Sequence, residues 1–278
     1  SMEVQPGMIT GLIGRNGSGK STTFKALLGL IHPDGGEIEV FGKKAEELKP
    51  EDKQKLGVVF ADSGFSMYLT AAGVANIMKS IYPDFDREKF LQQCRRFNLP
   101  TDKKIKEFST GMKAKFKVLA ALSHKAELLI LDEPLSGLDP INTDLFKGII
   151  REEIEAGKYL IMSSHQMATV EEFCTDLTIL DRSRTVLQGH LNDIKKGYGR
   201  VHLQLKTEED AGPYIAESGA QIVTRKEFEY QLKVTGQEQA NDLLARLTRA
   251  GVTVVLFNLR EPSLHEIFVE TVGGESDA

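Results

Sequence analysis

An octapeptide close to the start of the chain constrains its fold more than any other feature. It reads Gly14-Arg15-Asn16-Gly17-Ser18-Gly19-Lys20-Ser21, is followed by Thr22, and fits the phosphate-binding pattern of glycine, four free positions and Gly-Lys-Ser/Thr. Glycines let the backbone turn so that its N–H groups can point at a triphosphate. The apolar residues 8–13 predict a strand that feeds the loop, and residues 22–30 predict the helix that leaves it. The motif therefore favours an α/β nucleotide-binding fold.

The side chains of this loop match the chemistry of a bound nucleoside triphosphate. A helix that begins near Gly19 would direct the positive end of its dipole at the phosphates. Lys20 can reach the outer phosphates, and the Ser21 hydroxyl can hold a magnesium ion. We therefore expect the residues from Gly14 to Thr22 to form the phosphate site. A glycine-rich surface turn is the alternative interpretation, and the motifs further along the chain decide against it.

Composition excludes several classes of protein. Of the 278 residues, 41% are hydrophobic and 27% are charged, as in ordinary globular proteins. A net charge of −5 argues against a general nucleic-acid-binding protein, which would carry a basic excess. No apolar stretch has the length needed to cross a bilayer, and the first residues lack the features of a signal peptide. Cys94 and Cys174 are far apart and predict reduced thiols, consistent with a cytosolic protein. A membrane role would therefore need a separate partner.

The order of the expected elements predicts two domains. Residues 1–197 carry buried-strand runs that alternate with helical patterns, as in an α/β fold with a mainly parallel sheet. Within them, residues 66–125 predict an all-helical insertion. Glycines on both sides of Tyr198 mark a boundary. Residues 200–278 predict a small α+β module with the order βαββαβ, which is ferredoxin-like. In that module, Thr235-Gly236-Gln237-Glu238 has the spelling of a capping box and predicts the start of a helix.

Two adjacent carboxylates follow the most apolar strand of the sequence. Residues 128–131 are apolar at every position, as in a strand covered on both faces, and Asp132 and Glu133 come directly after them. Ligands bind at the carboxyl edge of the sheet in open α/β folds. Asp132 is suited to hold magnesium through water, and Glu133 can accept a proton from an attacking water or polarise it. Solvated acids at a strand end are the alternative, which the presence of Lys20 disfavours.

Three further segments, taken with these two motifs, resemble the ATP-binding-cassette (ABC) family. Phe108-Ser109-Thr110-Gly111-Met112 is similar to the family signature, typically Leu-Ser-Gly-Gly-Gln, at Ser109 and Gly111, and differs at the other positions. Ser136-Gly137-Leu138-Asp139-Pro140 is similar to the loop along the family's dimer seam. Ser163-Ser164-His165 places His165 at the family's switch histidine. Each segment alone would be an ordinary turn or strand end, but their order carries the resemblance over residues 2–195.

The closest similarity is to the ATP-binding subunits of bacterial exporters whose membrane part is a separate chain. Several such subunits carry a C-terminal extension that ends in a segment like residues 261–268, Glu-Pro-Ser-Leu-His-Glu-Ile-Phe. The resemblance thus extends, more weakly, to the whole chain. It implies a cytoplasmic protein, peripheral on the inner face of the cell membrane, that uses ATP and Mg²⁺ and binds no nucleic acid.

The resemblance also implies roles for individual residues. The catalytic groups would be Glu133, His165 and Lys20, and the metal ligands would be Ser21 and Asp132. Two copies would pack head to tail on binding ATP. Ser109 and Gly111 of one copy would then close over the ATP held by the other copy, with Asp139 along the seam.

Two departures from the family pattern stand out. The aromatic residue that stacks on adenine in the family is not visible in this chain. In addition, Ala61 occupies the aligned position of a glutamine that contacts magnesium and couples the site to the membrane partner. We expect the adjacent Asp62 to take part of that role, and a shifted alignment is the alternative. The departures motivate a second hypothesis, an ABC-type regulatory or binding module with little turnover.

Overall fold

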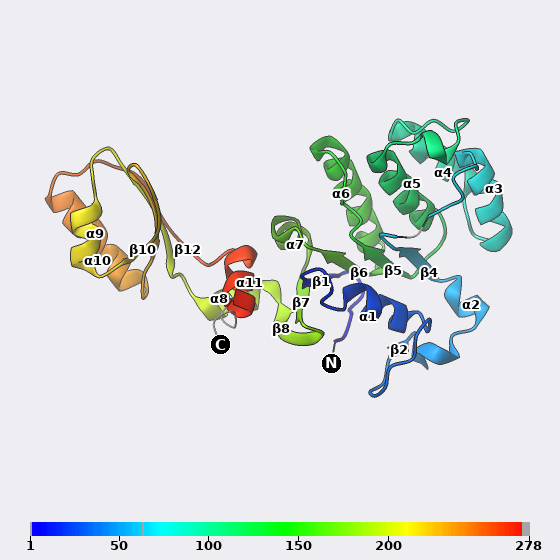
Figure 1. Ribbon diagram of the computed structural model, residues 1–278, viewed down its shortest axis with the longest axis horizontal. Helices are drawn as coiled ribbons and strands as arrows, with labels where there is room; N and C mark the ends of the chain where they lie inside the picture. The colour runs from blue at the N-terminus through cyan, green and yellow to red at the C-terminus, as the bar shows by residue number, and fades with distance from the viewer. Residues whose placement is uncertain (1, 63, 274–278) are drawn as a thin grey trace. The chain divides into compact units, whose positions relative to one another are not determined.

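The computed structural model describes residues 2–62 and 64–273, and the chain divides between Gln188 and Gly189 into two compact units (Figure 1). The division places helix α8 (Leu191–Tyr198) in the second unit. The domain limits drawn from the sequence, at residues 197 and 200, stay predictions.

The first unit is built on a six-stranded sheet in the order β4-β5-β6-β1-β7-β8. Its strands are β1 (Ile9–Gly14), β4 (Leu56–Val59), β5 (Leu128–Asp132), β6 (Tyr159–Ser164), β7 (Asp176–Asp181) and β8 (Arg184–His190). The pairs from β4 through to β7 are all parallel. This confirms the predicted α/β fold, and it brings the carboxyl ends of β1, β5 and β6 to one edge.

Helices on both faces explain why the central strands are apolar throughout. Every residue of β1 and β5 is buried, as expected for strands with helices on either side. In Figure 1, α1 (Lys20–Leu27) and α6 (Pro140–Glu155) lie on opposite sides of the sheet. One apolar core joins Phe24 and Leu28 near α1 to Leu12, Ile130 and Ile161 of the strands. The rest of this unit comprises β2 (Glu39–Val40), β3 (Lys43–Lys44), η1 (Ala45–Glu47), α2 (Pro50–Lys53) and α7 (Met167–Phe173).

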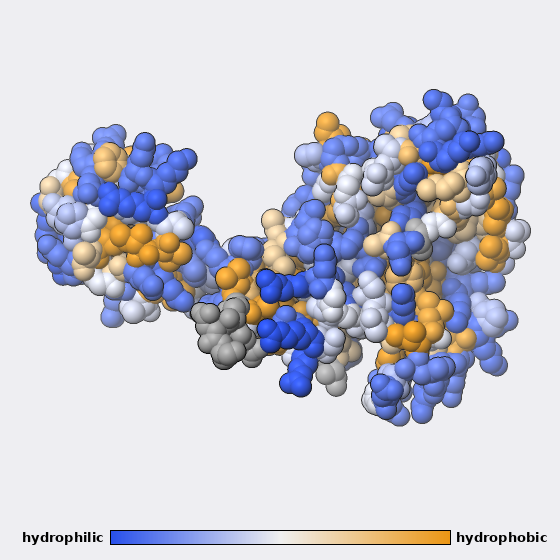
Figure 2. Space-filling view, viewed as in Figure 1, coloured by the Kyte–Doolittle hydropathy of each residue, from blue (hydrophilic) through white to orange (hydrophobic). Residues whose placement is uncertain are grey.

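Between β4 and β5, the described residues form helices rather than strands. They are α3 (Ala71–Ile81), α4 (Arg87–Arg96), the short η2 (Ile105–Glu107) and α5 (Thr110–Leu122). Aromatic rings hold this part together, because Phe116 of α5 makes edge contacts with Phe65, Phe90 and Phe108. Figure 2 shows apolar residues on the visible face over α3.

The second unit is a small sheet with helices packed on one face. Its strands run in the order β10-β11-β9-β12, and all neighbouring pairs are antiparallel. The elements are β9 (His202–Thr207), α9 (Gly212–Ser218), β10 (Gln221–Lys226), β11 (Glu229–Lys233), α10 (Gln237–Arg249), β12 (Val254–Arg260) and α11 (Leu264–Gly273). Alternate residues Leu203 and Leu205 of β9 pack with Ile215 of α9 and Leu243 of α10. The predicted order βαββαβ is confirmed.

The capping box expected at Thr235 is not formed. Helix α10 begins at Gln237 with Gly236 as its N-cap, and no side chain caps it. The backbone N–H of Thr235 donates instead to Oε1 of Gln239 at 2.7 Å, while Nε2 of Gln239 donates to the carbonyl of Ser218. The amide of Gln239 thus ties the start of α10 to the end of α9 and replaces the box.

Within the described part of the chain, we find no helix with the length and apolarity required to span a membrane.

Candidate active site

Glycines shape the loop that joins β1 to α1. A Cβ atom on Gly14 would lie 2.3 Å from Oγ of Ser18 and 2.4 Å from the carbonyl oxygen of Leu180, so this position has no room for a side chain. Gly17 and Gly19 have φ angles of 80° and 104°, in the left-handed region that other residues adopt at a cost. The glycines of the motif are therefore explained by the path of the loop.

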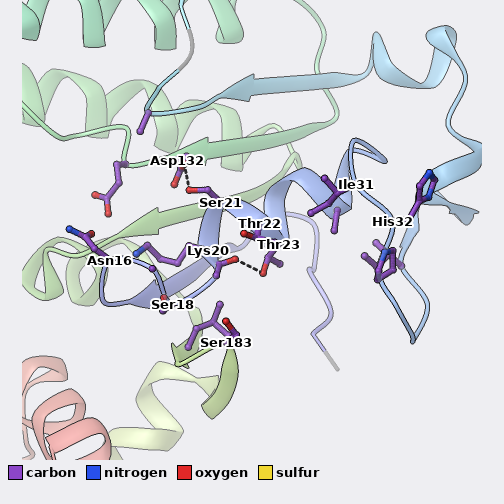
Figure 3. Close-up of a pocket in the computed structure, with 18 of the residues that line it drawn as sticks. Asn16, Ser18, Lys20, Ser21, Thr22, Thr23, Ile31, His32, Asp132 and Ser183 are labelled. Atoms are coloured by element: carbon purple, nitrogen blue, oxygen red, sulfur yellow. Dashed lines mark hydrogen bonds between the residues drawn. The ribbon is translucent and has the colours of Figure 1, made fainter.

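The Lys20 ammonium is held inside this loop. The residue is only 7% exposed. Its Nζ donates to the carbonyl oxygens of Gly14 at 2.8 Å and Arg15 at 3.2 Å. In Figure 3 the side chain extends from the start of α1 toward Asn16. A positive charge is thus fixed where the loop turns, as binding of a phosphate requires.

Ser21 and Asp132 meet across the carboxyl edge of the sheet. The Ser21 hydroxyl donates to Oδ2 of Asp132 at 2.7 Å, the contact drawn as a dashed line in Figure 3. Asp132 ends β5 and is 3% exposed. Two residues 111 positions apart in sequence therefore place two hard oxygen ligands side by side.

Glu133 and His165 form a second contact just beyond Asp132. Nδ1 of His165 lies 2.8 Å from Oε2 of Glu133, whose side chain is mostly buried while that of His165 is half-exposed. The backbone N–H of Glu133 donates to Oγ of Ser163 at 2.9 Å, and its φ of 50° is unusual for a residue with a side chain. Because β5 and β6 are adjacent, these residues from two strand ends converge.

The phosphate loop and both carboxylates lie along one cleft of about 700 Å³, whereas His165 contacts Glu133 without lining it. Its lining includes most of the predicted loop together with both carboxylates: Asn16, Gly17, Ser18, Gly19, Lys20, Ser21, Thr22, Asp132 and Glu133. Gly14 and Arg15 shape the loop without lining the cleft. Sequence reasoning missed Ser183, in the turn between β7 and β8, whose Oγ lies 3.6 Å from a Cβ built on Gly19. No local motif marks Ser183, because its place depends on the packing of a distant turn.

The segment after β4 reaches the cleft at Ala61, held by a lysine of α5. Nζ of Lys117 donates to the carbonyl oxygens of Phe60 and Ala61, each at 3.0 Å. Burial lowers the pKa of Lys117, and the charges of Asp62 and Asp132 oppose that shift. Asp62 itself is exposed and is absent from the residues that line the cleft. Its expected part in metal binding stays a prediction, and Lys117 was not foreseen from the sequence.

Ser109, Gly111 and Asp139 lie together at two helix starts, away from the lining of the cleft. Ser109 caps α5 by accepting a hydrogen bond from the Met112 N–H. Asp139 caps α6, and the bonds that it accepts from the backbone and side chain of Asn142 lower its pKa. Gly111 packs so closely on Gly137 that a Cβ would lie 2.7 Å from the Gly137 carbonyl oxygen. The two motifs therefore form one surface.

Comparison with known proteins decides the family. Residues 1–136 match the family described as ABC transporter, and residues 189–272 match the C-terminal domain of ATP-binding proteins like DrrA1-3. The chain is 32% identical to the uncharacterized ABC transporter ATP-binding protein YhaQ of Bacillus subtilis, over 98% of this chain and 92% of that protein. The chain belongs to the ABC transporter ATP-binding proteins. This ABC protein binds and hydrolyses ATP, as the family's ATP-binding domain does.

Two further comparisons extend this result. The ABC protein is 29% identical to the bacitracin transport ATP-binding protein BcrA of Bacillus licheniformis, over 99% of this chain and 91% of that protein. A solved structure of the ATP-binding cassette MJ0796, a dimer in a post-hydrolysis state bound to ADP and Pi, superposes with a TM-score of 0.61 at 21% identity. That match covers 68% of this chain and 88% of the cassette, and it supports the fold.

Proposed function

We propose that this ABC protein is the ATP-hydrolysing subunit of an exporter and that it powers a separate membrane subunit. One observation carries the proposal. Hydrogen bonds join Ser21, Asp132, Ser163 and the Glu133 backbone, and Glu133 contacts His165, all beside the phosphate loop. Hydrolysis needs a charge clamp, a metal ligand and a group that activates water. The metal ligands and the base lie along this line of contacts, and Lys20 supplies the positive charge in the adjacent phosphate loop.

The residues at the cleft fit a magnesium ion. Mg²⁺ binds oxygen ligands and is usually held by one or two carboxylates together with phosphate oxygens. Oγ of Ser21 and Oδ2 of Asp132 are such oxygens, 2.7 Å apart. The described residues contain no cluster of three or more His, Cys, Asp or Glu suited to a metal, so a nucleotide would supply further ligands. When bound, the ion would neutralise phosphate charge.

The protein's own side chains and backbone N–H groups take the other roles in hydrolysis. Lys20 and the loop N–H groups hold the outer phosphates. Glu133 takes the proton of the attacking water as its general base. With a proton on Nδ1, His165 donates to Glu133 and orients the carboxylate. A base needs such support because misplacement by about 1 Å can cost about 100-fold in rate.

We further propose that two copies pack head to tail. The surface of Ser109, Gly111 and Asp139 does not line the chain's own cleft, so it is free to meet another copy's ATP. The capped start of α5 offers N–H groups and a helix dipole to the γ-phosphate. The dimeric state of the cassette MJ0796 supports pairing of two copies. Closing on ATP and opening after hydrolysis would shift the population between the two states.

The helical part of the first unit offers a surface for the membrane partner. Its exposed apolar side chains lie in the segment before α3 and on the second half of that helix: Met67, Tyr68, Ile77 and Ile81. Apolar side chains that stay exposed in a group mark interaction sites. The protein would thus sit in the cytoplasm on the inner face of the membrane. The name of BcrA supports a transport role and leaves the cargo of this protein open.

The alternative hypothesis, a regulatory module with little turnover, rests on Ala61, which lines the cleft at the position aligned with the family's glutamine. The intact contact between Glu133 and His165 favours hydrolysis.

Light scattering of the Glu133→Gln protein with and without Mg-ATP tests the proposal. We expect a monomer that becomes a dimer with ATP, and turnover at least about 100-fold below that of the unchanged protein, since a general base contributes that much or more. Glu127→Gln is the matched control, since Glu127 precedes β5 at its opposite end and pairs with Lys55 on the surface. Undiminished turnover in Glu133→Gln would refute the mechanism. ATP binding without turnover in the unchanged protein would favour the regulatory module.

A further inference from the structure

Ser163 lies at the centre of the site although no role was assigned to it from the sequence. It is the fifth residue of β6, its exposure is 0%, and it pairs directly with Asp132 of β5 in the parallel ladder. Successive side chains of a strand point to opposite faces of the sheet. Ser163 and Ser164 therefore point to opposite faces, and Ser163 shares its face with the position two residues on, which His165 occupies. Strand geometry therefore aims this hydroxyl at the end of β5.

The Ser163 hydroxyl bridges the two acidic residues that follow one another in the chain. It donates to Oδ1 of Asp132 at 2.5 Å and accepts from the backbone N–H of Glu133 at 2.9 Å. A distance of 2.5 Å is typical of a strong hydrogen bond from a hydroxyl to a carboxylate. The hydroxyl has one proton to give, and it gives it to Asp132.

The bond to Asp132 determines which carboxylate oxygen faces the metal position. Oδ1 is engaged by Ser163, while Oδ2 receives the Ser21 hydroxyl at 2.7 Å. Each oxygen of the carboxylate thus accepts one hydrogen bond, and the two bonds hold the group in one orientation. Without Ser163, Asp132 could rotate and present its oxygens to the cleft at the wrong angle.

The bond to Glu133 supports a strained backbone. Glu133 has a φ of 50°, a conformation that persists in residues with a side chain only where the surroundings hold it. The hydrogen bond from its N–H to Ser163 is part of that support. The conformation in turn places Oε2 within 2.8 Å of His165.

We propose that Ser163 is a positioning residue that sets both the metal carboxylate and the general base of this ATPase. Its hydroxyl fixes the orientation of the Asp132 carboxylate toward the metal position. The same hydroxyl holds the backbone of Glu133 in the conformation that lets its side chain reach His165. The inference rests on the proposed hydrolysis by Asp132 and Glu133 and deepens it. Groups that orient a metal ligand commonly contribute about 10- to 100-fold to metal affinity or activity.

The test compares Ser163→Ala with Ser164→Ala in the full chain. Ser164 is similarly buried, at 4%, but its hydroxyl accepts from the Gln166 N–H rather than from the site. For each protein we would measure ATP affinity in EDTA, ATP affinity with Mg²⁺, and the Mg²⁺ dependence of turnover. In Ser163→Ala we expect an EDTA affinity within about twofold of the unchanged protein, a Mg²⁺ requirement raised about tenfold or more, and a reduced kcat. Ser164→Ala should match the unchanged protein in all three.

Ser163→Thr and Ser163→Cys separate positioning from folding. Threonine keeps the hydroxyl and should restore the Mg²⁺ response, whereas cysteine keeps the volume with a weak donor and should behave like alanine. If Ser163→Ala does not fold, Ser163→Cys decides the question. An unchanged Mg²⁺ requirement in a folded variant that lacks the hydroxyl would overturn the inference. Absence of turnover in the unchanged protein would instead refute the proposed function.

Discussion

At the scale of single residues, replacing two helical glycines by alanine should change the free energy of unfolding in opposite directions, because only one of them lies close to another backbone segment. Gly111 in α5 would bring a Cβ to 2.7 Å from the backbone oxygen of Gly137, whereas nothing lies within 4 Å of a Cβ on Gly148 in α6. We expect Gly111→Ala to lower the free energy of unfolding by about 1–3 kcal/mol through overpacking. Gly148→Ala should raise it by about 0.5–1 kcal/mol, since alanine favours the helix. Urea unfolding measures both.

Because Gly111 lies in the surface proposed to meet the partner's ATP, Gly111→Ala should also weaken ATP-driven dimerisation in the Glu133→Gln background. Changes of the same sign in the two glycine variants would show that the contact with Gly137 relaxes without cost.

Site residues differ in how far the sequence could predict them. Gly14, Lys20 and Ser21 belong to one continuous motif, so the roles proposed for them can be predicted from the local sequence alone. Ser163 and Lys117 act on groups 31 and 57 positions away, a proximity that only the sheet and the helical insertion create. A serine two residues before a histidine carries no signal of its own.

At the scale of elements, the start of α11 depends on one carboxylate. Glu266 accepts hydrogen bonds from both terminal nitrogens of Arg260 at 2.7 and 2.8 Å and from the Ser263 N–H at 2.7 Å. His202 lies 3.3 Å away. Burial raises the pKa of Glu266, but the bonds from Arg260 and Ser263 outweigh burial and lower it to about 2. The segment that resembles other exporter subunits thus has a structural explanation.

This lowered pKa predicts how Glu266→Gln depends on pH. A carboxyl with a depressed pKa stabilises the fold above its unfolded value, and that contribution is lost as pH falls from about 4.5 to about 2. At pH 7 we expect a loss of about 1 kcal/mol, modest because a third of the side chain is exposed.

The difference between the two proteins should shrink below pH 4.5 in thermal unfolding experiments. Glu270→Gln is the control on the same helix, because its exposed pair with Lys233 should contribute under about 0.5 kcal/mol. A loss for Glu266→Gln that stayed constant down to pH 2 would contradict the role of the charge.

Elements were predictable where burial leaves a pattern. The run of residues 128–131 is buried on both faces and reads as a strand from sequence alone. Strand β8 has no buried residue and no alternation of apolar and polar residues, so its sequence does not predict a strand. Helix α10 lies where the sequence predicts it, but the capping box at Thr235 was wrong because the side chain of Gln239 takes the Thr235 N–H, a contact that depends on the nearby end of α9.

At the scale of the whole molecule, the cleft and the core of the second unit are built from different parts of the chain. Every residue that lines the cleft precedes Gln188. The core of the second unit is built from its own residues, from Leu203 to Leu247. A ligand that binds only the folded first unit stabilises that unit by mass action, by about 2.7 kcal/mol at 100 times its Kd. Nucleotide should therefore leave the folding of the second unit unchanged.

Differential scanning calorimetry of the full chain can test this separation. We expect two transitions, and Mg-ADP at 100 times its Kd should raise one of them by roughly 5–10 °C, given the size of the first unit. Glu266→Gln should lower the other transition and leave the nucleotide-sensitive one in place. The transition that Mg-ADP raises is then assigned to the first unit, and the transition that Glu266→Gln lowers is assigned to the second. A single transition moved by both would mean that the two units fold as one, and nucleotide binding would then be coupled to the C-terminal module.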